Sequence, residues 1–408
     1  MGGVERLYLQ VSELPAEQIT IQLPGSKSIS NRLLVMRQLS GNSIEIERLS
    51  EADDTVLLER ALNNDTGEMW LGDAGTALRF GLAWASVSKG ERILRGSARL
   101  SQRPIRPLVE ALRLLGADIH YLEKEGFLPL KVTGKKLQRA VVEIEASESS
   151  QFTSALMLIA PYVAGGLEIS RKGHIVSEPY VAMTRNLMVE AGAEVSIQAE
   201  KIVVEEGAYQ ETTFEVEPDW SAASYFYAVC ALSGNAGLRL QGLRKASSQG
   251  DAVVADLFRS FGVQTRYTAA GAQLSHTGFV EETPVIDFLK CPDLAQTVAV
   301  VAAGLRHPCR LEGLQTLRVK ETDRIAALST ELAKCGVTCD FGPDFLELKS
   351  FSKPEETPHI STYGDHRMAM AFAPLALVLG GIVIESPKVV SKSFPGFWVE
   401  LEKVGIGL

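Results

Sequence analysis

The sequence predicts an α/β fold of two pseudo-symmetric lobes, each containing three repeated units. Three features support this prediction: amphipathic helical segments that recur at a regular spacing, apolar helical segments between them, and short runs that are typical of strands. The chain has 408 residues, which is enough for two or more domains. Its composition, 46% hydrophobic and 22% charged, is ordinary for a globular protein.

The amphipathic segments give the clearest repeat. Each opens with polar or charged residues, ends near a glycine and leads into a β-like run. The five segments read RPIRPLVEALRLLGADIHYL, EPYVAMTRNLMVEAGAEVSI, GDAVVADLFRSFGVQTRY, ETDRIAALSTELAKCGVTCDF and FPGFWVELEKVGIGL. Their closing glycines are Gly116, Gly192, Gly262, Gly336 and Gly405, separated by 76, 70, 74 and 69 residues. Because glycine supplies the left-handed residue that ends a helix, this spacing indicates a structural repeat.

Two further patterns complete each unit. The apolar segments read TALRFGLAWASV, FTSALMLIAPYVAG, SAASYFYAVCALSG, DLAQTVAVVAAGL and HRMAMAFAPLALVLG. Since they are apolar on nearly every side, they predict buried helices. Runs such as AVVEIEA, GLEISR and FLELKS are rich in β-branched residues and predict strands. A sixth amphipathic segment, EADDTVLLERALNNDTGEM, lacks the glycine at the helix end and is weaker; it brings the total to six units.

Charge and hydropathy narrow the class of protein. The net charge of −9 argues against a nucleic-acid-binding surface. No apolar run approaches the roughly 20 residues that a membrane span needs, and the N-terminal residues include no apolar signal core. We therefore expect a cytoplasmic protein with no nucleic-acid or membrane partner. A monomer is the default because no assembly surface is evident.

The five cysteines are odd in number and scattered, which fits a reducing cytoplasm better than a disulfide framework. Cys335 and Cys339 have a four-residue spacing, but no second pair of ligands follows them. We expect no bound metal and no cofactor.

Hydroxyl and cationic residues gather where the helices of the first half begin. In LPGSKSISNR (23–32), a Pro-Gly turn leads into a helix start that carries serines, a lysine and an arginine. Taken singly, such residues are ordinary helix caps or solvated cations. Together, helix N-termini with hydroxyl, lysine and arginine donors suit phosphate groups. The candidates in this half are Lys27, Ser28, Arg32, Asp73, Gly75, Arg103, Ser149, Ser150, Gln151, Ser177 and Tyr180.

The second half offers a possible base and further cations. Asp293, in CPDLAQTVAV, is either a helix N-cap or a general base for a substrate hydroxyl. The segment RVKETDR (318–324) is either a solvated helix start or one wall of an anion site. The candidates here are Asp293, Thr316, Lys320, Glu321, Arg324, His366, Arg367 and Lys392.

Seven of these cations stand at unit starts in a chain that is acidic overall: Lys27, Arg32, Arg103, Lys320, Arg324, Arg367 and Lys392. This contrast favours a cleft that binds several anionic groups at once, and so the site-wall interpretation of RVKETDR. The residues alone therefore predict a transferase or lyase that acts on phosphorylated, carboxylated small molecules.

The motifs LPGSKSISNR, GDAGTALR, RPIRPLVEAL, SSQFTSAL, RVKETDR, GDHRMAMAFA and SKSFPGF, in this order, resemble the 5-enolpyruvylshikimate-3-phosphate synthases, or 3-phosphoshikimate 1-carboxyvinyltransferases. The resemblance spans about residues 20–400. It implies the enolpyruvyl transferase fold, an inside-out α/β barrel of two lobes with three βαβαββ units each. It further implies one lobe from residues 20–217, whose first unit is shortened, and a second from residues 1–19 plus 218–408.

The resemblance also implies the reaction, in which phosphoenolpyruvate and shikimate-3-phosphate give 5-enolpyruvylshikimate-3-phosphate and phosphate by addition and elimination. The implied catalytic residues are Asp293 as base for the 5-hydroxyl, with Glu321 and Lys27 handling the proton at C3. The implied shikimate-3-phosphate set is Lys27, Ser28, Arg32, Ser149, Ser150, Gln151, Ser177, Tyr180, Asp293, Thr316 and Lys320. The implied phosphoenolpyruvate set is Lys27, Asp73, Gly75, Arg103, Gln151, Glu321, Arg324, His366, Arg367 and Lys392.

The chain departs from the family pattern at several positions. Asp73 stands where asparagine is usual, and a second anion there should weaken phosphoenolpyruvate binding unless it is protonated or turned away. Thr316 also replaces a usual asparagine, and Phe80 a usual proline. No strand pair fits between Leu62 and Leu71. Gly75 is retained, so the resemblance implies inhibition by glyphosate.

Two alternatives stay open at this stage. The related enzyme that transfers enolpyruvyl to UDP-N-acetylglucosamine shares the fold but usually relies on a cysteine in a mobile loop of the first lobe, and the first cysteine here is Cys230. An inactive binding protein could keep the fold, although it would not need Asp293, Glu321, Lys27 and Arg367 together.

Overall fold

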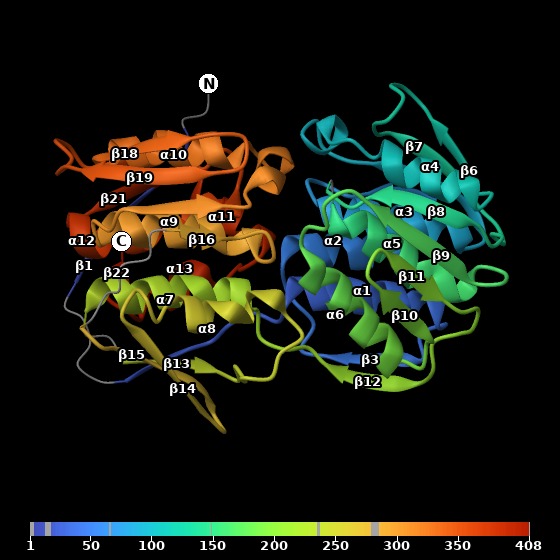
Figure 1. The fold of residues 1–408 in the computed structure, drawn as a ribbon, viewed down its shortest axis with the longest axis horizontal. Helices are drawn as coiled ribbons and strands as arrows, with labels where there is room; N and C mark the ends of the chain where they lie inside the picture. The colour runs from blue at the N-terminus through green and yellow to red at the C-terminus, as the bar shows by residue number, and fades with distance from the viewer. Residues whose placement is uncertain are drawn as a thin grey trace. The chain divides into compact units, whose positions relative to one another are not determined.

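The computed structural model describes residues 4–12, 18–64, 67–147, 149–234, 237–278 and 285–407. The chain divides into two compact units, one formed by Gly25–Val216 and the other by Met1–Pro24 together with Glu217–Leu408 (Figure 1). We call them the continuous unit and the discontinuous unit.

The described part of the continuous unit has three sheets. The first has the strand order β4 (Glu68–Trp70), β5 (Gly90–Arg95), β7 (Leu130–Gly134), β6 (Asp118–Tyr121), and the second β8 (Val141–Glu145), β9 (Leu167–Lys172), β11 (Lys201–Val204), β10 (Val195–Gln198). The third pairs β12 (Thr212–Glu215) with β3 (Ile44–Glu47). Its buried helices are α1 (Lys27–Leu39), α3 (Gly75–Val87) and α5 (Ser150–Ile159), and its amphipathic helices are α2 (Asp53–Leu62), α4 (Arg106–Leu114) and α6 (Glu178–Glu190).

The described part of the discontinuous unit also has three sheets. Their strand orders are β20 (His359–Ile360), β21 (Ile382–Glu385), β1 (Arg6–Val11), β22 (Ile406–Gly407); β2 (Ile19–Ile21), β13 (Leu238–Gln241), β15 (Gly271–His276), β14 (Val263–Thr268); and β16 (Val285–Asp287), β17 (Cys309–Glu312), β19 (Leu346–Phe351), β18 (Val337–Phe341). Its buried helices are α7 (Trp220–Ser233), α9 (Ala295–Gly304) and α11 (His366–Phe372), the last continued by α12 (Ala376–Leu379). The remaining helices are α8 (Val254–Leu257), α10 (Arg324–Lys334) and α13 (Phe397–Glu402).

The predicted fold class is confirmed by these elements. The runs β4-α3-β5-α4-β6-β7 and β8-α5-β9-α6-β10-β11 each follow the βαβαββ order. In each of these sheets the first two strands are parallel and the others antiparallel. The sheets of a unit are separate in their hydrogen bonding and do not close into one strand barrel. Figure 1 shows α7 and α9 between the β18–β19 hairpin and the β13–β15 strands, with the helices on the inside.

The chain passes from one unit to the other after β2 and again after β12. Strand β2 pairs in parallel with β13 of the discontinuous unit, yet it leads into α1 of the continuous one. Strand β12 pairs with β3 of the continuous unit and leads into α7 of the other. Because β2 joins the β13 sheet, the first division follows Pro24, whereas the resemblance implied a lobe that starts at residue 20. In the described residues the β3–β12 sheet has two strands, because β4, the first strand of the next βαβαββ repeat, follows soon after α2.

The five closing glycines have the left-handed conformation that the repeat predicts. Their φ angles are 95° at Gly116, 86° at Gly192, 77° at Gly262, 83° at Gly336 and 76° at Gly405. The apolar segments are buried helices, also as predicted: nine residues of α9 and all seven of α11 are buried. The helices therefore begin at fixed positions on a rigid core, and the polar residues at their N-terminal ends are held in place.

These glycines allow a matched test of helix termination. A methyl group at Gly336 would lie 2.4 Å from the carbonyl oxygen of Ser352, whereas one at Gly116 would meet nothing within 4 Å. We expect Gly116→Ala to lower the free energy of unfolding by about 1 kcal/mol, through backbone strain alone. We expect Gly336→Ala to lower it by about 2–4 kcal/mol, because strain and a clash add. Urea denaturation of both variants measures the difference, and equal losses would contradict the role of the Ser352 contact.

Candidate active site

The discontinuous unit contains a buried cluster of charges at the ends of its helices. Its centre is Arg324, the first residue of α10, whose side chain is 1% exposed. The guanidinium of Arg324 contacts Asp293 at 3.1 Å, Glu321 at 2.9 Å and Asp365 at 2.6 Å. These carboxylates raise the pKa of Arg324 although burial, the largest single effect, lowers it. One arginine therefore joins carboxylates from three separate segments.

Asp293 lies in the 3₁₀ helix η4 (Pro292–Leu294) that leads into α9. Its Oδ1 accepts from Arg324, and its Oδ2 accepts from Nη2 of Arg367 at 2.9 Å; Nζ of Lys320 is 3.6 Å from Oδ1. Burial, the largest effect, would raise the pKa of Asp293, but Arg367, Lys320 and Arg324 together hold it well below the usual range. The N-cap positions of η4 and α9 are occupied by Cys291 and Leu294, so Asp293 is not the N-cap residue of either helix.

Glu321 and Lys392 extend the cluster. One oxygen of Glu321 contacts Arg324, and the other contacts Nζ of Lys392 at 3.0 Å. Lys392 is the last residue of the 3₁₀ helix η7 (Pro387–Lys392). Burial lowers the pKa of Lys320. The charged residues of RVKETDR therefore fall into two groups. Lys320, Glu321 and Arg324 belong to the cluster. Arg318 instead pairs with Asp323 at 2.7 Å, and both side chains are partly exposed.

Arg367, near the start of α11, is held from several sides. Asp365 caps α11 by accepting from the backbone N–H of Arg367 at 2.9 Å. The guanidinium of Arg367 also donates to Tyr225 Oη at 3.4 Å and to Ser221 Oγ at 3.5 Å, both on α7. Asp365, Tyr225 and Ser221 were not among the predicted site residues. Asp365 could have been predicted from its position directly before His366 and Arg367. Ser221 and Tyr225 could not, because the apolar sequence of α7 predicts a buried core helix.

Two further predicted residues of this unit are His366 and Thr316. His366 is buried, and its Nδ1 is 3.7 Å from Asp365. Thr316 lies in η5 (Gln315–Val319), is 7% exposed, and its hydroxyl has no hydrogen-bond partner among the described residues. Their roles in substrate binding stay predictions.

In the continuous unit, the starts of α3 and α5 form a second cluster. Nη1 of Arg79 donates to the carbonyl oxygen of Gly75 and to Oε1 of Gln151, both at 2.9 Å. Gln151 in turn donates to Thr76 at 3.1 Å. A methyl group at Gly75 would lie 2.5 Å from Nη1 of Arg103 and 2.7 Å from Nη1 of Arg79. The absence of a side chain at Gly75 therefore makes room for two guanidinium groups, of which Arg79 was not a predicted site residue.

Lys27 and Arg32 lie on α1 of the continuous unit. Nζ of Lys27 contacts Asp54, in the first turn of α2, at 2.9 Å. Asp54 was missed because acids in a first helical turn are common for electrostatic reasons alone. Arg32 is buried and donates to Thr184 and to the carbonyl oxygen of Ser28, both at 2.7 Å. Burial lowers its pKa to about 10, so it is still a cation at neutral pH.

The other donors of Arg32 are also directed at protein atoms. Its Nη2 donates to Ser154 and to the carbonyl oxygen of Tyr180, both at 3.2 Å. Arg32 thereby ties α1 to α5 and α6, on which Ser154 and Tyr180 lie. Ser149 caps α5 by accepting from the N–H of Gln151, next to Ser150, and Ser177 precedes α6 with a left-handed φ of 54°.

Asp73, the residue that replaces the usual asparagine, is held by a neighbouring turn. Ser97 donates its hydroxyl to Asp73, and the same hydroxyl accepts from the N–H of Leu100 at 3.1 Å. One oxygen of the carboxylate is therefore engaged with this turn, and the effect of Asp73 on phosphoenolpyruvate binding stays a prediction.

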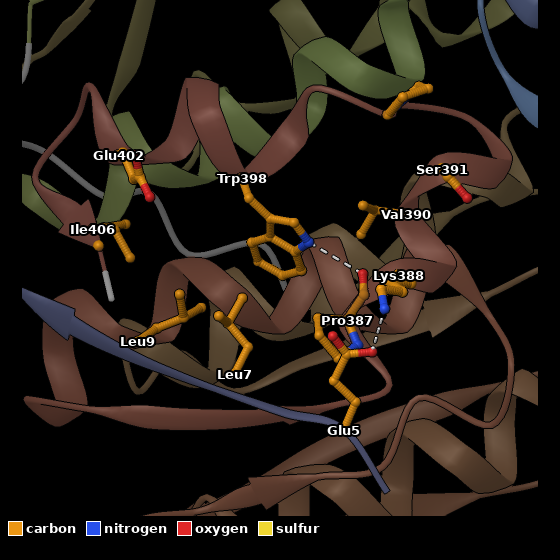
Figure 2. Close-up of a pocket in the computed structure, with 12 residues that line it drawn as sticks. Glu5, Leu7, Leu9, Pro387, Lys388, Val390, Ser391, Trp398, Glu402 and Ile406 are labelled. Carbon is orange, nitrogen blue, oxygen red and sulfur yellow. Dashed lines mark hydrogen bonds and ion pairs between the residues drawn. The ribbon is translucent and has the colours of Figure 1, made fainter.

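A cavity of about 470 Å³ lies elsewhere, between β1, η7, α13 and β22 (Figure 2). Its walls are mostly apolar and include Leu7, Leu9, Val390 and Trp398. None of the predicted site residues lines it. Within the described residues we find no group of three or more potential metal ligands, and no helix there is long and apolar enough to cross a membrane. Among the described residues the five cysteines form no disulfide, and Cys230 is buried in α7.

Comparisons with known proteins agree with this architecture. The family model for EPSP synthase (3-phosphoshikimate 1-carboxyvinyltransferase) matches residues 59–401. A 3-phosphoshikimate 1-carboxyvinyltransferase of Bacteroides fragilis (strain YCH46) is 44% identical over 392 residues, covering 95% of this chain and 96% of the relative. One of Sulfurovum sp. (strain NBC37-1) is 35% identical over 415 residues, covering 94% and 96%.

Two solved structures share the fold. EPSP synthase from Acinetobacter baumannii has a TM-score of 0.78 at 21% identity, covering 98% of each chain. The enolpyruvyl transferase NikO from Streptomyces tendae has a TM-score of 0.73 at 14% identity, covering 99% of this chain and 98% of that one. The curated relatives do not favour the UDP-N-acetylglucosamine alternative. From the family model and the full-length relatives, we conclude that the chain belongs to the EPSP synthase family.

Proposed function

We propose that the chain transfers the enolpyruvyl group of phosphoenolpyruvate to the 5-hydroxyl of shikimate-3-phosphate and releases phosphate. Membership of the EPSP synthase family supports this reaction. The structural observation that carries the proposal is the buried cluster in which Asp293 is kept ionised by Arg324, Arg367 and Lys320. A carboxylate with this environment has both the charge to act as a base and cationic neighbours that bind anions.

In the proposed mechanism, Asp293 takes the proton of the 5-hydroxyl while that oxygen forms a bond to C2 of phosphoenolpyruvate. A proton is added at C3, which gives a tetrahedral intermediate. The bond from C2 to the phosphate oxygen then breaks, phosphate leaves and C3 loses a proton. Glu321 and Lys27 handle the proton at C3. Each proton that is taken up is released again, so no oxidant, reductant or other co-reactant is needed.

Carboxylates hold the cations of this cluster in position. Lys392 is paired with Glu321, and Arg367 with Asp293. We assign Arg103, Arg324, Arg367 and Lys392 to phosphoenolpyruvate, and Ser28, Ser149, Ser150, Ser177, Tyr180 and Lys320 to shikimate-3-phosphate. Preorganised cations of this kind stabilise charge in a transition state at little reorganisation cost.

The buried position of Arg32 changes its proposed contribution. Its donors contact Thr184, Ser154 and backbone carbonyl oxygens, so it supports the residues around it on α1 and α6. We propose that it acts on shikimate-3-phosphate through the positions of Ser28 and Tyr180. We also propose that the protein works in the cytoplasm as a monomer, where a reducing environment keeps its five cysteines out of disulfides. Equilibrium sedimentation would test the monomer.

The first prediction from the proposed function concerns the acceptor substrate. We expect phosphate release from phosphoenolpyruvate in the presence of shikimate-3-phosphate, and none with UDP-N-acetylglucosamine. A colorimetric phosphate assay with each acceptor, and with neither as the blank, measures this. Release with UDP-N-acetylglucosamine would support the alternative acceptor, and release with neither would support the inactive binding homologue.

The second prediction tests the base. Asp293→Asn keeps the shape of the side chain but removes its basicity, so we expect kcat to fall by about 10²–10⁴-fold. Shikimate-3-phosphate binding, measured by calorimetry, should persist. Asp340→Asn is the control, because Asp340 is an exposed residue of β18 whose nearest cation is Lys349 at 3.8 Å. Near-normal turnover in Asp293→Asn would remove Asp293 from the mechanism.

The third prediction uses the space at Gly75. In Gly75→Ala, the new methyl group must displace the guanidinium of Arg103 or Arg79. We expect the KM for phosphoenolpyruvate to rise by about tenfold, which corresponds to 1.4 kcal/mol, and inhibition by glyphosate, competitive with phosphoenolpyruvate in the parent enzyme, to weaken. Gly81→Ala is the matched control on the same helix, because its methyl group would meet only the flexible end of Met69, at 3.1 Å. Unchanged KM and inhibition in Gly75→Ala would show that these guanidinium groups do not contact phosphoenolpyruvate.

A further inference from the structure

A second buried carboxylate, Asp251, lies close to the Asp293 cluster and has no part in the mechanism above. It belongs to the 3₁₀ helix η3 (Gly250–Val253) and is 3% exposed. Its Oδ2 accepts from the hydroxyl of Ser221, whereas its Oδ1 has no hydrogen-bond partner among the described residues. A buried carboxylate with one unsatisfied oxygen destabilises a fold, so it calls for a functional explanation.

The segment that carries Asp251 is firmly held at the start of α7. Glu217 accepts from the hydroxyls of Ser247 and Ser248 and from the side chain of Gln249 at 3.0 Å. Gln249 in turn accepts from the N–H of Trp220 at 3.1 Å and donates to the carbonyl oxygen of Pro218 at 2.8 Å. Asp251 is therefore kept in place by contacts other than its own.

A short chain of contacts links Asp251 to Asp293. Ser221 donates to Asp251 and accepts from Nη2 of Arg367 at 3.5 Å, and the same Nη2 donates to Asp293 at 2.9 Å. The residues in this series of contacts come from four segments: η3, α7, α11 and η4. Arg367 thus lies between Asp251 and Asp293; it contacts Asp293 directly and is linked to Asp251 through Ser221.

Three charged groups act on Asp251 from the surrounding elements: Asp219 at the start of α7, Asp293 in η4 and Arg367 in α11. The thiol of Cys291 beside η4 is in turn affected by Asp251. Burial, followed by the charge of Asp293, raises the pKa of Asp251 to about 6, against the opposing effects of Arg367 and Ser221. Burial and the neighbouring acids raise the pKa of Cys291 to about 12, so it is a neutral thiol at physiological pH.

We propose that Asp251 is a positioning residue that orients Arg367 through Ser221 and, in its ionised form, keeps Asp293 basic enough to accept the substrate proton. This inference rests on the proposed role of Asp293 as base. Three cations lower the proton affinity of Asp293, and a base with too low an affinity is inefficient. Coupling between two titrating groups is reciprocal, so the charge of Asp251 raises the proton affinity of Asp293 as the charge of Asp293 raises that of Asp251.

The consequence is a dependence of turnover on pH. When Asp251 takes up a proton, its charge no longer offsets the field of Arg367, and Asp293 becomes a weaker base. Turnover of the parent enzyme should therefore fall as the pH drops through about 6. The phosphates of both substrates also titrate near pH 6, so the informative quantity is the difference between variants measured with the same substrates.

The test compares the pH profiles of kcat, from pH 5 to 9, for the parent, Asp251→Asn, Ser221→Ala and Asp256→Asn. We expect Asp251→Asn to lower kcat by about three- to tenfold at pH 8, the loss expected for up to one pKa unit of basicity. The ratio of parent to variant kcat should shrink toward one as the pH falls below 6. Asp256→Asn, on the adjacent α8, is the matched control, because Asp256 is exposed and pairs with Arg259; its profile should match that of the parent.

Ser221→Ala gives a second test that does not depend on Asp251→Asn folding. Loss of the hydroxyl removes a contact that lowers the proton affinity of Asp251, so the acidic limb of kcat should move to higher pH. Thermal unfolding at pH 8 separates function from structure: Asp251→Asn should be at least as stable as the parent, because it removes a buried charge.

Several results would overturn the inference. A constant kcat ratio between the parent and Asp251→Asn from pH 5 to 9, or an acidic limb that is the same in the parent and Ser221→Ala, would show that Asp251 does not tune the base. Near-normal turnover of Asp293→Asn would remove the base itself and the inference with it. An inactive parent enzyme would instead refute the proposed function, and the two failures are thereby distinguished.

Discussion

The buried guanidinium of Arg324 is the constraint on which the discontinuous unit depends. Moving an arginine out of water is costly unless hydrogen-bonded anions surround it. Here Asp293, Glu321 and Asp365 supply these anions, and they come from η4, the α10 approach and the N-cap of α11. Loss of Arg324 would remove the cation that all three carboxylates share, whereas loss of one carboxylate would leave Arg324 with two. The ends of the helices are therefore fixed by the same contacts that bring the reactive groups together.

This arrangement also couples anion binding to the strength of the base. Both oxygens of Asp293 are occupied, one by Arg324 and the other by Arg367. In the proposed function, phosphoenolpyruvate draws Arg367 toward itself, which would weaken the contact of Arg367 with Asp293 and raise the proton affinity of that carboxylate. Arg32 of the continuous unit differs, since it donates to hydroxyl groups and backbone carbonyl oxygens.

Local patterns allowed much of the fold and part of the site to be predicted. Helix ends are local, so Gly116 and Gly336 could be recognised from the sequence alone, and a cation next to such a helix could be assigned to its N-terminus. The direction of a side chain is not local. Arg32 and Lys27 have similar sequence settings, yet one is buried among carbonyl oxygens and the other pairs with Asp54. The sequence around Asp251 did not predict a role for this residue, because Ser221 and Arg367, to which it is linked in the fold, are distant in sequence.

The order of strands has a consequence for how the two units form. Residues 25–216 contain every strand and helix of the continuous unit, whereas the discontinuous unit needs both ends of the chain. Strand β1 pairs with β21 and β22, and β2 pairs with β13, across separations of more than 200 residues. Closing such long loops is entropically costly, and the sheet of β1 needs β21 and β22 near the C-terminus, whereas the sheet of β2 needs no strand beyond β15. The cluster around Arg324 draws on residues 293–392 of the discontinuous unit, whereas Lys27 and Gln151 belong to the continuous unit, whose elements all lie within residues 25–216.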